Sequence, residues 1–70
     1  MGIKVAWNRN MTASVVLSKI KEFTITESEH RDNRFTVRGW YNETNCFVFG
    51  DDFEHLIVAQ AFLNNIYDKM

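Results

Sequence analysis

RFTVRGWYNETNCFVFG, residues Arg34 to Gly50, contains two runs of alternating side chains separated by a polar connection. In each run every second residue is aromatic or aliphatic, which is the period of a β-strand that buries one face. Aromatic and β-branched residues also favour strands intrinsically. The connection between the runs, YNETNC, is rich in turn-forming residues. The segment therefore predicts two antiparallel strands joined by a short connection.

A third strand is expected upstream, where Phe23 and Ile25 alternate with threonines. The connection EHRDNR that follows it is again rich in turn formers. Together these segments predict a three-stranded antiparallel meander over about residues 22–49. If both connections hold an odd number of residues, side chains of the same parity share one face of the sheet.

The two faces of this meander differ in polarity. The odd-numbered positions form an apolar face: Phe23, Ile25, Phe35, Val37, Gly39, Tyr41, Phe47 and Phe49. The even-numbered positions form a mostly polar face: Thr24, Thr26, Ser28, Thr36, Arg38, Trp40, Cys46 and Val48. In this register Phe49 lies opposite Gly39, so its ring can cover the gap that the glycine leaves. The odd face is expected to be the core face.

The C-terminal segment predicts a helix over about residues 52–68. Apolar residues recur there at spacings of three and four and form one stripe: Leu56, Ala59, Leu63, Ile66 and Met70, widened by Val58 and Phe62. We expect Asp51 to cap the helix, with Glu54 in the reciprocal position of a capping box. Packing this helix on the odd face gives an α+β fold, an antiparallel sheet of three to four strands with one C-terminal helix.

The N-terminal segment has two interpretations, a strand or a short helix. Ile3, Val5 and Trp7 alternate with other residues, which favours a strand. Residues 11–21 fit either a short helix or an extended strand, and the β-branched residues among them favour the strand.

Length and composition limit the function classes. Seventy residues, 46% of them hydrophobic, form a single domain over residues 1–70 with a small core. The single cysteine, Cys46, allows no internal disulfide, which makes self-association as a homodimer an option for extra stability. The chain has neither an apolar run long enough to span a membrane nor a secretory pattern at its start. A cytoplasmic protein without membrane association is expected.

Reactive groups are sparse. Cys46, His55 and either Asp51 or Asp52 supply the residue types of a cysteine nucleophile, its base and an orienting group. Cys46, however, is expected on the even face, whereas the helix that bears His55 packs on the odd one. Two histidines and one cysteine are too few for a structural zinc site, and phosphate-loop and dinucleotide fingerprints are absent. We therefore expect neither catalysis, nor a metal, nor a cofactor.

Three residues of the even face, Arg38, Trp40 and Val48, are the candidate partner contacts. Tryptophan and arginine are enriched at interface hot spots, and an apolar island on a small soluble domain often marks a contact site. Two outcomes are open, depending on residues 1–20. If that segment covers the even face, Trp40 is an ordinary core residue; if it does not, Trp40 is free to bind a protein partner.

A second apolar surface lies on the flank of the expected helix, away from its main stripe. It comprises Ile57, Ala61 and Tyr67 and is a candidate seam for a homodimer. Such a seam would bury side chains that the sheet does not cover.

The charges are distributed unevenly. Residues 1–21 carry four cations and no acid, whereas residues 22–70 carry nine acids and four cations. The N-terminal cations are Lys4, Arg9, Lys19 and Lys21. They could steer a protein partner, or contact phosphates while Trp40 stacks on a base of single-stranded nucleic acid. Because the net charge of -1 gives little general attraction for phosphate, nucleic-acid binding is the alternative and protein binding is preferred.

The terminal layout CFVFGDDFEHLIVAQAFLNNI, residues 46–66, combines a strand with an Asp-capped aromatic helix. This layout, the small size and the acid-leaning charge resemble small phage-encoded proteins that block host machinery, the anti-CRISPR proteins. The resemblance covers about a third of the chain and carries over no individual residue. It implies a non-enzymatic inhibitor or adaptor that occludes a host protein.

Overall fold

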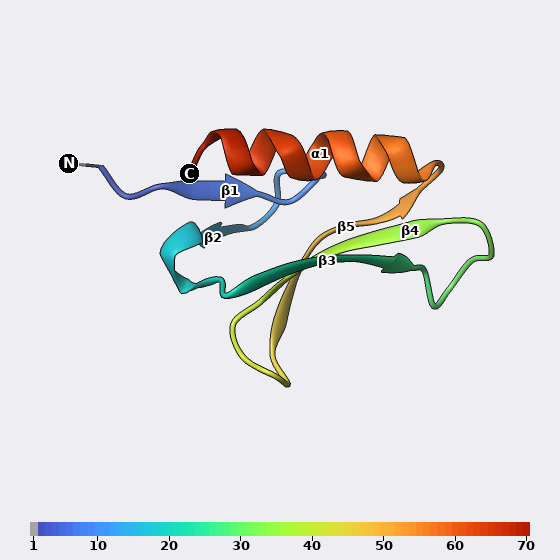
Figure 1. Cartoon of the computed structure of the whole chain (residues 1–70), viewed down its shortest axis with the longest axis horizontal. Helices are drawn as coiled ribbons and strands as arrows, with labels where there is room; N and C mark the ends of the chain where they lie inside the picture. Colours follow the sequence, from blue (N-terminus) through green and yellow to red (C-terminus); the bar gives the residue numbers. More distant parts are fainter. Residues whose placement is uncertain (1) are drawn as a thin grey trace.

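The computed structural model describes residues 2–70 as two small antiparallel sheets and one α-helix (Figure 1). The elements are β1 Val5–Trp7, β2 Ser14–Val16, the 3₁₀ helix η1 Leu17–Lys19, β3 Glu22–Glu27, β4 Phe35–Trp40, β5 Cys46–Phe53 and α1 Leu56–Asp68. Strands β3, β4 and β5 form a three-stranded sheet in that order, and β1 pairs with β2 in a separate hairpin. The expected α+β fold, with a C-terminal helix packed on an antiparallel sheet, is confirmed.

The sheet has the expected apolar face, but one expected pairing is wrong. Gly39 pairs with Phe23 on one side and with Phe47, not Phe49, on the other. The reason is the connection after β4, which places Trp40 directly opposite Cys46. The ring of Phe49 covers Gly39 nonetheless, since a Cβ atom added at Gly39 would lie 2.8 Å from its Cε2 atom.

Two irregularities in β5 explain how Phe49 reaches this position. The pairing of β4 with β5 shifts between Arg38 and Val37 and again between Val37 and Phe35, because β5 contains extra residues at both points. Such bulges bend a strand and increase its local twist. Asp52, within this bulged part, has the left-handed φ of 67° that few residues other than glycine adopt.

The bulged strand also moves the start of the helix. β5 continues through Phe53, and α1 begins at Leu56 with His55 as N-cap and no side-chain capping bond. The expectation that Asp51 caps the helix is therefore wrong, because Asp51 is still part of the strand. Only the middle of the expected apolar stripe is buried, namely Ala59, Leu63 and Ile66, whereas Leu56 at the start of the helix and Met70 after its end are exposed.

The N-terminal segment is a strand, a turn, a second strand and one turn of 3₁₀ helix. Val5 pairs with Val16 and Ala6 with Val15. Figure 1 shows β1 on the same side of the three-stranded sheet as α1. The core is accordingly built from the hairpin, the odd face of the sheet and the helix: Ala6, Val15, Leu17, Ile20, Val37, Phe49, Phe53, Ala59, Leu63 and Ile66.

The end of the even face that bears Trp40 and Val48 therefore stays open. Residues 5–20 pack on the odd face, where Ile20 lies against Gly39 and the guanidinium of Arg9 lies 4.4 Å from the centre of the Phe53 ring. Val48 on the even face is 43% exposed. The described part of the N-terminal segment, residues 2–20, thus does not cover Trp40.

Candidate binding surface

Trp40 lies across the open face and is tied to the neighbouring strand. Its indole Nε1–H donates a hydrogen bond to the hydroxyl of Thr24 on β3, with a donor–acceptor distance of 2.9 Å. The side chain is half-buried. A tryptophan held in one orientation by such a bond loses little further conformational freedom when a partner covers it. The sequence placed this residue on the even face, but only the structure supplies the hydrogen bond that orients it.

Arg38 and Val48 lie beside Trp40 as expected. The Arg38 guanidinium donates a hydrogen bond of 2.8 Å to the hydroxyl of Thr26, and Arg38 pairs directly with Val48. A cross-strand row of Thr24, Arg38 and Val48 thus runs over all three strands. The structure brings the three candidate contacts together on one open surface, which we call the Trp40 surface: Thr24, Thr26, Arg38, Trp40, Cys46 and Val48.

A hollow of about 620 Å³ opens at one side of the Trp40 surface. Its lining is Lys21, Glu22, Thr24, Thr26, Trp40, Asn42 and Glu43. Two carboxylates and one ammonium group give it an acidic balance, and the indole provides its large apolar surface. This composition suits a cationic or mixed apolar group of a partner better than a phosphate.

The four N-terminal cations do not form one positive surface. Lys4 donates a hydrogen bond of 2.6 Å to the backbone oxygen of Met70, and Arg9 stacks on Phe53. Lys19 is exposed at the end of η1. Of the four, Lys21 lines the hollow beside Trp40. The structure therefore separates the predicted steering charges from one another.

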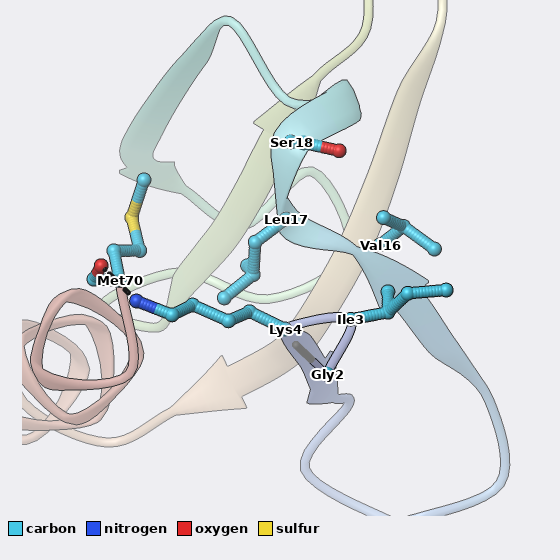
Figure 2. A pocket seen from close by; sticks show the side chains of 7 residues that line it. All are labelled: Gly2, Ile3, Lys4, Val16, Leu17, Ser18 and Met70. Carbon is cyan, nitrogen blue, oxygen red and sulfur yellow. Dashed lines mark hydrogen bonds between the residues drawn. The ribbon is translucent and has the colours of Figure 1, made fainter.

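A second hollow of about 520 Å³ lies between the start of β1, the 3₁₀ helix and the end of the chain. Figure 2 shows the Lys4 side chain crossing it to reach Met70, with Leu17 beside it. The other lining residues are Gly2, Ile3, Val16 and Ser18. It is mostly apolar, and its one ammonium group already has a hydrogen-bond partner within the chain. This hollow therefore presents no free charged group for recognition.

The residues of the candidate dimer seam lie on the outer part of α1. Ile57 is 72% exposed, and Ala61 is exposed as well. Tyr67 is not free on all sides, since its ring and that of Phe23 make a T-shaped contact at a centroid distance of 5.3 Å. This contact fixes the end of α1 against β3, and the seam stays a prediction.

The sequence missed a polar cluster at the far end of the even face. The hydroxyl of Thr36 donates a hydrogen bond of 2.6 Å to Asp51, whose carboxylate also accepts from the backbone N–H of Asp52. Hydrogen bonds from Thr36 and Ser28 lower the pKa of Asp51 from its usual value of 3.8. Both hydroxyl residues are buried. In the sequence Thr36 alternates with Phe35 and Val37 as an exposed strand threonine would, and Ser28 lies between two glutamates, so neither pattern indicates burial.

The residue types considered for catalysis are kept apart. Cys46 is the first residue of β5, and His55 follows the last by two positions. At about 3.3 Å per residue, the eight-residue strand that lies between them spans roughly 23 Å. Within residues 2–70, no group of three or more His, Cys, Asp and Glu side chains is placed to hold a metal ion. Over the same residues, no helix has the length and apolar character to cross a membrane.

The fold and this surface define a small α+β protein with one covered and one open sheet face. Comparison of the chain with protein-family models, with curated proteins and with solved structures finds no match.

Proposed function

We propose that this chain is a non-enzymatic, cytoplasmic protein-interaction module that binds and occludes a partner protein through the Trp40 surface. Such a module fits the expectation of a phage-type inhibitor or adaptor. The observation that carries the proposal is Trp40 itself, which lies on an uncovered sheet face and is held there by its hydrogen bond to Thr24.

The neighbours of Trp40 support this function. Arg38 is positioned by Thr26, and Val48 presents an exposed apolar side chain next to it. An aromatic and an arginine close together on a rigid element are the residue types that contribute most binding energy at protein interfaces. Because the strands fix their spacing, little reorganisation is needed on binding.

Single-stranded nucleic acid is the alternative ligand, and the charge distribution supports it less. Trp40 could stack on a base. The hollow beside it, however, contains Glu22 and Glu43 with Lys21. The remaining N-terminal cations lie elsewhere, for example Arg9 on the Phe53 ring.

The test is capture followed by affinity measurement. The immobilised protein is incubated with lysate of its native host, the bound molecule is identified, and its affinity is measured with purified components. Trp40→Ala is expected to weaken binding about 30- to 1,000-fold, since a hot-spot side chain contributes about 2–4 kcal/mol. Its circular dichroism and unfolding midpoint should remain close to those of the parent.

The chain offers a matched control in its other tryptophan. Trp7 is 43% exposed on the N-terminal hairpin, away from the Trp40 surface. Trp7→Ala should leave partner affinity unchanged. Loss of binding in Trp7→Ala but not in Trp40→Ala would overturn the site. Capture of single-stranded RNA or DNA, with affinity that falls steeply with salt, would overturn the protein-binding function in favour of the alternative.

A further inference from the structure

β3 is an edge strand without the usual protection. It pairs with β4 on one side, and the strand order leaves its other edge free within the described part of the chain. All six of its residues pair with β4 in a regular register, without a bulge. Its charged residues, Glu22 and Glu27, are at the two ends, and the middle reads Phe-Thr-Ile-Thr. Natural proteins commonly protect such an edge with a bulge, a proline or a central charge, because a free edge invites another strand.

The register with β4 identifies the backbone groups that point to the free edge. The N–H of Ser28 donates to the carbonyl of Arg34, which makes these two residues a hydrogen-bonded pair. Hydrogen-bonded pairs recur at every second residue of an antiparallel ladder. Thr26 and Thr24 therefore bond to β4, whereas Phe23 and Ile25 direct their N–H and C=O groups outward.

We propose that β3 binds β3 of a second copy of this chain, antiparallel and about a twofold axis through Thr24. Phe23 then lies opposite the partner's Ile25, so that the outward N–H and C=O groups of both residues meet. The two three-stranded sheets become one sheet of six strands. The proposal concerns self-association of the purified chain and does not rest on the proposed binding of another protein.

The charges and side chains select this register among the alternatives. A shift by one residue would oppose an outward backbone group with an inward one. A shift by two residues would place Glu27 against Phe23, or Lys21 against Ile25. In the proposed register Phe23 and Ile25 face each other twice, once on each side of the axis, and no charged residue of β3 faces an apolar one.

The side chains along the edge fit a second copy on both faces. On the odd face Phe23 and Ile25 are only half-buried, and Tyr67 packs against Phe23 from the helix. A partner strand would cover the exposed sides of these residues. On the even face two Thr24 residues meet at the axis, a cross-strand pairing that threonine favours.

Cross-linking tests the register directly. In the proposed dimer the two Thr24 residues form a non-hydrogen-bonded pair, whose Cα atoms lie about 4.5 Å apart and within disulfide range. Thr24→Cys in a Cys46→Ser background should give a covalent dimer under mild oxidation. Thr26→Cys in the same background should not, because Thr26 faces the partner's Glu22. A cross-link through Ile57→Cys instead would overturn the proposal in favour of the helix seam.

A charge at the twofold axis tests the same register without oxidation. Sedimentation equilibrium of the purified chain over a concentration series should show a monomer–dimer equilibrium. Thr24→Lys should raise the dimer dissociation constant about tenfold, because two like charges then meet at the axis. An equal mixture of Thr24→Lys and Thr24→Glu should restore dimerisation, and Glu29→Lys, in the turn after β3, should have no effect.

Each outcome of these experiments either supports or overturns the proposed β3–β3 dimer. A chain that stays monomeric at every concentration overturns the proposal, as does a dimer that Thr24→Lys leaves unchanged. Because no third molecule is present, either failure leaves the proposed binding of a host protein untouched.

Discussion

The hydroxyl of Thr36 donates a hydrogen bond to the carboxylate of Asp51 over 2.6 Å, which ties β4 to the bulged end of β5. Thr36 is only 2% exposed. The same Asp51 oxygen accepts the backbone N–H of Asp52, whose φ of 67° is unfavourable for a residue with a side chain. Asp51 therefore stabilises a strained part of the strand, and this role depends on its negative charge.

The first prediction concerns acid stability. Hydrogen bonds from Thr36 and Ser28 lower the pKa of Asp51, so its ionised form stabilises the folded state. This contribution is fully present above the unfolded value of 3.8 and is lost as the pH falls through the lowered folded value. Asp51→Asn should be less stable than the parent at neutral pH, with a difference that narrows under acid conditions. Urea unfolding at several pH values measures it.

Asp32→Asn is the matched control for this prediction. Asp32 is exposed in the turn before β4, so the change should alter the free energy of unfolding at neutral pH by less than about 0.5 kcal/mol. An Asp51→Asn difference that stays constant with pH would show that the carboxylate does not act through its ionisation.

Asp51 also illustrates what the sequence could not reveal. An Asp three residues before a Glu and an apolar run is the pattern of a capping box. The pattern is local, whereas the two bulges that keep Asp51 inside β5 depend on packing. Phe53 is 1% exposed and lies in the core, so the strand continues until this ring is buried. A helix start four residues later than expected follows from that burial.

The parts that the sequence did predict rest on periodicity. The period of two assigned Phe23 and Val37 to the core face and Trp40 to the open face, because odd- and even-numbered side chains of these strands point to opposite faces of the sheet. The N-terminal hairpin was harder to predict, since Val5 and Val16 pair across a turn without a standard hairpin sequence. That turn is held by Asn8, whose side-chain oxygen accepts the N–H groups of Thr12 and Ala13.

The second prediction compares two leucines on α1. Leu63 is 8% exposed within the core, whereas Leu56 is 45% exposed. Leu63→Ala should lower the free energy of unfolding by about 2–4 kcal/mol, because a buried cavity remains. Leu56→Ala should lower it by less than about 1 kcal/mol. Chemical denaturation measures both, and equal effects would show that the start of the helix is buried after all.

The third prediction concerns Arg9, expected from the sequence to be a steering charge. Its guanidinium lies 4.4 Å from the centre of the Phe53 ring, which links the N-terminal hairpin to β5. Arg9→Gln should lower the free energy of unfolding by about 0.5–1 kcal/mol through the lost cation–π contact. Lys19→Gln, an exposed cation at the end of η1, should change it by less than half as much. Equal stability of the two variants would contradict a structural role for Arg9.

The last prediction uses the close approach of Phe49 to Gly39. A Cβ atom at position 39 would lie 2.8 Å from the Phe49 ring and 3.1 Å from Cγ2 of Ile20. Phe49 is fully buried, so its ring has little room to move. Gly39→Ala should therefore lower the free energy of unfolding by about 1–3 kcal/mol through overpacking.

A second change separates this clash from a general effect of losing a glycine. Gly2→Ala has nothing within 4 Å of the added atom and should leave stability unchanged. Phe49→Leu alone should be destabilising, because it removes part of a buried ring. In the double variant Gly39→Ala/Phe49→Leu, the smaller side chain makes room for the added methyl group, so the combined loss should be smaller than the sum of the two single losses. Strict additivity would show that the two residues do not compete for the same space.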